Sequence, residues 1–194
     1  MKIGTRSMAV MASLVALNVA IGGLVHVLKI PIFLDAIGTI LAVLLLGRNP
    51  GIVVGVLSFL AAAAFVNPVY VWFVGTQAVI AIFIFIAADR FSAFKTPIRA
   101  IVAGLGLGLA AGVASAPVIV AVFGGVSGSG RDLITVALVA AGRQVYRAVI
   151  LSGAASEPVD KILQTLAAYY VLKSLPKSLL ARFRNPVLEK NGLV

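Results

Sequence analysis

Only a few side chains in this sequence could recognise or transform a small molecule, and they lie in short polar stretches between long apolar runs. Carboxylates, amides, guanidinium groups and aromatic rings can hold a polar, planar solute through hydrogen bonds, ion pairs and stacking. The candidate binding residues are Asp35, Asn67, Tyr70, Trp72, Gln77, Arg143, Gln144, Arg147, Asp160 and Lys161. Together these residue types predict a binding site for a small organic solute.

Several of the same residues also have a structural interpretation. Tyr70 and Trp72 could belong to the aromatic belt at a membrane surface, and Asn67, which precedes a proline, could cap a helix. Asp35 could likewise cap the short apolar segment that follows it. The amide of Gln77, which should lie below the membrane interface, could serve a hydrogen bond between helices.

The motifs of several enzyme classes are missing from the sequence. It has no cysteine and a single histidine, and it lacks the motifs G-x-x-x-x-G-K-[ST], G-x-S-x-G and H-E-x-x-H. We therefore expect no catalytic residue, no bound metal and no cofactor, and we expect any ATP hydrolysis to occur in a partner protein. A membrane enzyme that acts on a lipid headgroup is an alternative, for which the available carboxylates are Asp35, Glu157 and Asp160.

The composition indicates an integral membrane protein. Of the 194 residues, 61% are hydrophobic and only 11% are charged, whereas about one quarter of a soluble domain is charged. The formal net charge of +10 would favour nucleic acid in a soluble protein, but here the basic residues separate apolar runs of membrane-spanning length. We expect a single multi-pass domain, residues 1–194, in the plasma or inner membrane, with no nucleic acid as partner.

The apolar runs predict an all-α bundle of six transmembrane helices. The expected spans are residues 7–28, 32–46, 51–66, 68–88, 98–124 and 158–175. Lys and Arg collect at the N-terminus, after the second and fourth spans and in the C-terminal tail, so both termini should be cytoplasmic. The N-terminal run has the basic start of a signal peptide, but it is long for one and lacks a convincing cleavage site.

Two segments compete for the position of the last span. Leu133–Ala155 would place Arg143 near the middle of the bilayer, at a cost of roughly a few kcal/mol. Pro158–Leu175 keeps its charges at its ends, and Pro158 suits the first position of a helix. We therefore expect the last span at 158–175 and an external or re-entrant helical element over 131–156, with Leu133–Ala155 as the alternative span.

This topology concentrates the polar side chains in the outer half of the bundle and leaves the cytoplasmic half almost entirely apolar. His26 and Lys29 end the first span, and the candidate binding residues lie at the same level. Polar groups in a bilayer are costly, and a transport path would place them at successive depths. The asymmetry predicts a cup that opens to the outside rather than a path through the bilayer.

Small residues recur every four positions in two places, at Ala12, Ala16 and Ala20 and at Gly104, Gly108 and Gly112. In lipid, such faces allow two helices to approach closely. The glycines should therefore pack inside the bundle. The alanines could do the same or form a docking face for another membrane subunit.

Several stretches resemble one known family of membrane proteins. The second expected span reads IFLDAIGTILAVLLLG, residues 32–47, and is followed by RNPG and by a Val-Gly pair at 54–55. LNVAIGG at 17–23, SGSG at 127–130 and EPVDK at 157–161 also fit, in the same order along the chain. In these features the sequence resembles the substrate-binding S-component of energy-coupling factor (ECF) transporters over nearly its whole length.

The resemblance implies a six-helix bundle that binds a vitamin or similar micronutrient near its outer face and has no ATPase of its own. It also implies two kinds of partner, a transmembrane coupling protein (the T-component) and two cytoplasmic ATPases. The coupling protein would contact the first helix at Ala12, Ala16 and Ala20. Substrate would lie against the outer loops and the outer ends of the fourth to sixth helices.

Neither the residues nor the resemblance identifies the substrate. Arg143 and Arg147 share a helix face, and with Trp72 they would suit a planar ligand that carries an anionic or carbonyl group. The two arginines could equally pair with Glu157 and Asp160. A ligand-free membrane assembly protein, whose outer polar residues form only salt bridges and caps, is the alternative function.

Overall fold

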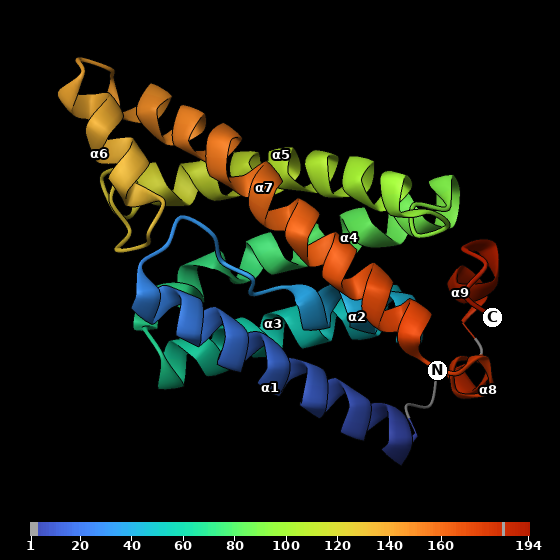
Figure 1. Cartoon of the computed structure of the whole chain (residues 1–194). Coiled ribbons are helices and arrows are strands. Elements are labelled where there is room, and N and C mark those ends of the chain that lie inside the picture. Colours follow the sequence, from blue (N-terminus) through green and yellow to red (C-terminus); the bar gives the residue numbers. More distant parts are fainter. Residues whose placement is uncertain (1–3, 184) are drawn as a thin grey trace.

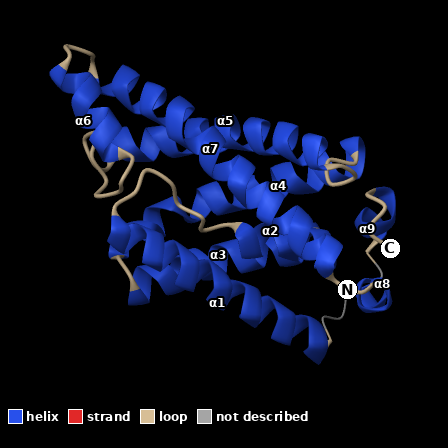
Figure 2. Cartoon of the chain, in the orientation of Figure 1, coloured by secondary structure: helices blue, strands red, loops and turns tan. Residues whose placement is uncertain are grey.

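The structure, a computed structural model, describes residues 4–183 and 185–194, and every regular element within these residues is a helix (Figure 2). The longer helices lie side by side in a bundle (Figure 1) and are α1 (Thr5–Leu28), α3 (Arg48–Phe65), α4 (Val74–Phe91), α5 (Pro97–Ala121) and α7 (Val145–Ser174). The shorter elements are α2 (Ile37–Leu46), η1 (Pro68–Phe73), α6 (Asp132–Ala140), α8 (Lys177–Leu180), η2 (Ala181–Phe183) and α9 (Pro186–Lys190).

Four stretches of the described chain are long and apolar enough to cross a membrane, namely α1, α3, η1 together with α4, and α5. They coincide, within a few residues at each end, with the first, third, fourth and fifth expected spans. Large apolar side chains point outward from them, for example those of Leu24, Leu57 and Val102. The all-helical fold class is confirmed, and these helices are compatible with a membrane protein.

The short helix α2 lies at the centre of the bundle and contacts α1, α3, α4 and α7. The expected span 32–46 is helical only from Ile37, and the residues before it form a loop. Ten helical residues rise about 15 Å, which is half the thickness of the hydrocarbon layer. All residues of α2 except the last are buried by other helices. The apolar character of this segment therefore reflects burial in protein.

The glycines of α5 bring this helix close to α7. A Cβ atom at Gly108 would lie 2.5 Å from the Cα atom of Pro158, and one at Gly104 would lie 2.6 Å from that of Ile162. Gly112, one turn further along, is also buried. The expectation that these glycines pack inside the bundle is confirmed.

We expect Gly108→Ala to destabilise the folded protein, because the new methyl group would push the α7 backbone away at Pro158. Overpacking of this kind costs about 1–3 kcal/mol, and we expect a melting temperature that is lower by roughly 3–10 °C. Thermal unfolding followed by size-exclusion chromatography measures the shift. Gly75→Ala on α4 is the matched control, because a Cβ atom there meets no atom within 4 Å. Equal melting temperatures of the two variants would contradict the close packing of α5 and α7.

The segment after α5 differs from the prediction. Residues 131–156 do not form one external element, because α6 ends at Ala140, residues 141–144 form a turn and α7 begins at Val145. The alternative of a single helix over Leu133–Ala155 is wrong for the same reason, and Gly142, with a φ of +84°, lies in that turn. Pro158 is inside α7 rather than at its first position. With 30 residues, α7 is about 45 Å long and exceeds the thickness of the hydrocarbon layer.

The C-terminal helices cover one end of the bundle. The side chain of Asn185 donates hydrogen bonds to the carbonyl groups of Val43 and Leu44 in the last turn of α2, and that of Asn191 donates to Ala88 O in α4. These side-chain amides therefore tie the C-terminal segment to the last turns of α2 and α4. The start of α1 lies toward the same end, and α6 lies at the opposite end (Figure 1).

Candidate functional site

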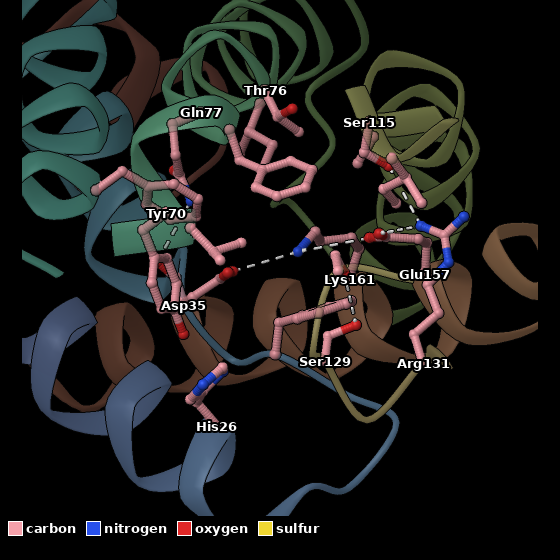
Figure 3. Close-up of a pocket in the computed structure, with 18 residues that line it drawn as sticks. His26, Asp35, Tyr70, Thr76, Gln77, Ser115, Ser129, Arg131, Glu157 and Lys161 are labelled. Atoms are coloured by element: carbon pink, nitrogen blue, oxygen red, sulfur yellow. Dashed lines mark hydrogen bonds and ion pairs between the residues drawn. The ribbon is translucent and has the colours of Figure 1, made fainter. Parts of the chain in front are cut away.

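A cavity of about 660 Å³, counting the part open to solvent, is lined by both polar and apolar side chains (Figure 3). The elements that line it belong to the half of the bundle away from α8 and α9. Its wall comes from the end of α1, the α1–α2 loop, α3, η1, the start of α4, the second half of α5, the loop before α6 and the middle of α7. Its main polar side chains are those of His26, Asp35, Tyr70, Thr76, Gln77, Ser115, Ser129, Arg131, Glu157 and Lys161.

Lys161 is the central charge of the cavity wall. Its Nζ atom donates to Asp160 Oδ2 at 2.6 Å and lies 3.5 Å from Asp35 Oδ1 and 3.8 Å from Glu157 Oε2. The lysine side chain is only 3% exposed, so these ion pairs are shielded from water. Glu157 and Lys161 are one helical turn apart on α7, whereas Asp35 comes from the α1–α2 loop. The cluster therefore ties this loop to α7.

Arg131 is a second buried cation of the wall, and its side chain is 1% exposed. Its Nη1 atom lies 3.3 Å from Glu157 Oε1 and donates to Ser115 Oγ, while Nε donates to Ser152 Oγ and Nη2 to Val149 O. These partners lie on α5 and α7. The guanidinium group therefore fixes the loop before α6 against the closely packed helix pair.

Asp160 is buried behind the cavity and orders the loop that carries Asp35. Its Oδ1 atom accepts hydrogen bonds from the backbone N–H groups of Phe33 and Leu34, both at 2.9 Å. Gln164, one turn along α7, donates to Asp160 Oδ2 and accepts from Ala36 N. The loop backbone thus depends on two side chains of α7 for its hydrogen bonds.

A network of amides and hydroxyls connects the remaining helices beside the cavity. Asn18 of α1 donates to Thr39 Oγ1 of α2 and to Ser58 Oγ of α3, and it accepts from Gly38 N. Thr39 in turn donates to Gln77 Oε1 of α4 at 2.9 Å. Because Gln77 lines the cavity, this network connects α1 to the cavity wall through buried hydrogen bonds.

Part of the predicted binding set lines the cavity, namely Asp35, Tyr70, Gln77 and Lys161. Asp35 does not cap α2, because the N-cap position is Ala36 and no side chain bonds there. The ring of Tyr70 packs edge-on against that of Phe59 with 5.2 Å between the centroids. Residues from three distant parts of the chain are therefore brought to one wall.

The other predicted binding residues lie outside the cavity wall. Arg143 and Gln144 are exposed in the turn between α6 and α7, which projects at one end of the bundle (Figure 1), and Arg147 is exposed in the first turn of α7. Trp72 is 55% exposed, and Asn67 caps η1 with its side chain. Asp160 acts on the loop rather than on the cavity. A binding role for these residues gains no support from this geometry.

Two charged residues of the wall, Arg131 and Glu157, are missing from the predicted binding set. The four-residue spacing of Glu157 and Lys161 is the signal that places both on one helix face. No spacing in the sequence indicates that Arg131 reaches back to Glu157, because the contact depends on how the loop before α6 folds. Asn18, an amide inside an apolar span, is the corresponding signal for the buried network.

Comparisons of the chain with protein-family models, with curated proteins and with solved structures give no match. The described residues define an all-helical protein with membrane-length apolar helices and a cavity lined by charged side chains. Its function is inferred from this cavity and from the surface of the bundle.

Proposed function

We propose that this chain is the solute-binding membrane subunit of an ECF-type importer, which captures a vitamin or related micronutrient outside the cell and delivers it through a coupling protein and ATPases. The observation that carries the proposal is the cavity itself, where Asp35, Glu157 and Lys161 gather among helices with long apolar stretches. Ionisable groups among membrane helices are costly, and they typically mark a binding site or pathway.

In this proposal the chain crosses the plasma or inner membrane six times. The six segments are α1, the α1–α2 loop together with α2, α3, η1 together with α4, α5, and α7. The end of the bundle that carries α8, α9 and the α4–α5 turn also carries basic residues, among them Lys95 and Lys190. Basic residues favour the cytoplasmic side of a membrane. Both termini would then be cytoplasmic, and the cavity would face the outside.

The outer face of α1 fits a membrane partner. Ala12, Ala16 and Ala20 are all exposed, and the buried residues of this helix lie on its other side, at Met11, Leu14, Asn18, Gly22 and Val25. A face of small side chains lets another helix approach closely in lipid. This arrangement supports the expectation that a transmembrane coupling protein docks there.

We expect native mass spectrometry of gently purified protein to detect one small organic molecule bound per chain. Ala111→Leu, which adds bulk to the cavity wall, should lose that molecule. Ala110→Leu, at the neighbouring position outside the wall, should retain it and is the matched control. Protein that is empty in every gentle preparation would contradict the proposal and favour a ligand-free assembly protein.

A further inference from the structure

We infer that the cavity selects an organic cation, a planar aromatic solute that carries an amine or amidinium group, rather than an anion. This inference rests on the proposed function, because it names the class of solute that the same cavity takes. It reverses the expectation based on Arg143 and Arg147, which favoured an anionic or carbonyl ligand. Both arginines are exposed and lie outside the cavity wall.

The charged cluster at the cavity has more acidic than basic side chains. Asp35, Glu157 and Asp160 surround Lys161, and Arg131 is the only other cation of the cluster among the described residues. With all five groups ionised, the formal charge of this cluster is −1, and the side chains of all five residues are 10% exposed or less. A buried charge without a partner is strongly unfavourable. A cationic solute would restore the balance.

Both basic side chains already direct their donors at protein groups. Three carboxylates lie within 4 Å of Lys161 Nζ, which has three N–H groups. Arg131 bonds through Nε, Nη1 and Nη2 to serine hydroxyls, to Val149 O and to Glu157. These contacts use all but one of the charged N–H groups, so an anionic solute would have to compete with protein partners for most of them.

The carboxylates, in contrast, keep acceptor positions that no protein group fills. An ionised carboxylate has about four lone-pair sites. Within the described residues, no hydrogen bond from another residue reaches Asp35 Oδ2, and Glu157 Oε2 has only the 3.8 Å ion pair with Lys161. Every fully buried side-chain oxygen in these residues has a hydrogen-bond partner. Because Asp35 Oδ2 and Glu157 Oε2 have no such partner, they are not fully buried and a solute can reach them. Both residues line the cavity (Figure 3) and offer acceptors to a bound N–H group.

Aromatic rings supply the rest of the recognition. Phe33, Phe59, Tyr70 and Phe73 all line the cavity, and ring faces attract cations. The Nζ atom of Lys161 already lies 5.7 Å from the centroid of Phe33, in the geometry of a cation–π contact. The hydroxyl of Tyr70 can donate or accept, so it suits a ligand of either charge. Carboxylates beside ring faces favour a flat cation.

Three probes of similar size and shape test the inference on the whole purified chain: benzamidinium, benzamide and benzoate, which differ in charge. Ligand-observed NMR titration measures the affinity of each. We expect benzamidinium to bind roughly tenfold or more tightly than benzoate. Asp35→Asn should weaken benzamidinium roughly tenfold and leave benzamide nearly unchanged, and Asp35→Glu should restore part of the loss. Asp89→Asn, the same change at the far end of α4, is the matched control.

Each outcome decides a different point. Tighter binding of benzoate, or an Asp35→Asn variant that still prefers benzamidinium to the same degree, would overturn the cation selectivity while leaving solute binding intact. If no probe binds, the molecule retained in native mass spectrometry decides, since an amine or amidine supports the inference and a carboxylate or phosphate refutes it. Protein that binds no probe and retains no molecule would refute the proposed function and this inference together.

Discussion

Lys161→Met should lower the melting temperature of the protein by roughly 10 °C or more, or prevent folded protein from accumulating. The substitution keeps an unbranched apolar side chain but removes the ammonium group on which Asp35, Glu157 and Asp160 converge. Removing one partner of a buried ion pair costs about 3–5 kcal/mol, because the other charge is left buried. Here three carboxylates lose their shared partner, and the α1–α2 loop loses a tie to α7.

Thermal unfolding in detergent, monitored by size-exclusion chromatography, measures this effect. Lys95→Met is the matched control, because Lys95 is exposed in the turn between α4 and α5 and its loss should leave the melting temperature nearly unchanged. The double variant Lys161→Met/Asp35→Asn should recover part of the stability, since it removes one of the unpaired charges. The ion pairs would contribute little if Lys161→Met had the melting temperature of the parent protein. The same would follow if the effect of the double variant on stability equalled the sum of the effects of its two single substitutions.

The apolar runs predicted the long helices well, and the reason is physical. In a bilayer every backbone polar group must be satisfied within the segment, so an apolar run of sufficient length is helical. This holds for α1, α3 and α5, whose bounds differ from the expected spans by a few residues. It fails for α2, because ten helical residues buried by protein on all sides have the same composition as part of a span.

Local sequence signals predicted that the last long helix begins at Pro158, whereas α7 begins at Val145. Pro158 and the acidic residues around it have the pattern of a helix N-terminus, yet the helix runs through them from Val145. Tertiary contacts explain the difference, because Pro158 packs against Gly108 and Glu157 pairs with Arg131 and Lys161. The acidic side chain thus serves the cavity wall instead of the end of a helix.

The sequence indicated which types of side chain would form the candidate site, but it identified only some of the individual residues. Four residues of the predicted set, Asp35, Tyr70, Gln77 and Lys161, line one cavity. The sequence could not distinguish Arg131, which is buried against Glu157, from Arg143, which is exposed in the turn between α6 and α7. Both arginines follow α5 in the sequence, and only the fold of the loop before α6 determines which of them is buried. The inferred ligand therefore changed from an anionic or carbonyl compound, based on Arg143, to a cation.

Ala16→Trp should reduce recovery of the proposed coupling protein with this chain roughly tenfold or more, while leaving the fold and the proposed solute binding intact. Ala16 lies at the middle of the exposed small-residue face of α1, between Ala12 and Ala20. A tryptophan ring there would keep a second helix from close approach. It would point away from Leu14 and Asn18, which pack inside the bundle, so the melting temperature should change little.

Copurification from membranes that contain the proposed importer partners, followed by quantification of the coupling protein, measures the loss. Ala154→Trp makes the same change at an exposed position of α7 and should not affect recovery. Undiminished recovery with Ala16→Trp would move the docking face elsewhere, and equal losses with both variants would point to a general effect of a bulky surface residue. The same helix also reaches the cavity wall, because Asn18 bonds to Thr39, which bonds to Gln77. If Ala16→Trp still retains solute, the loss of the coupling protein is therefore a loss of docking and not of solute binding.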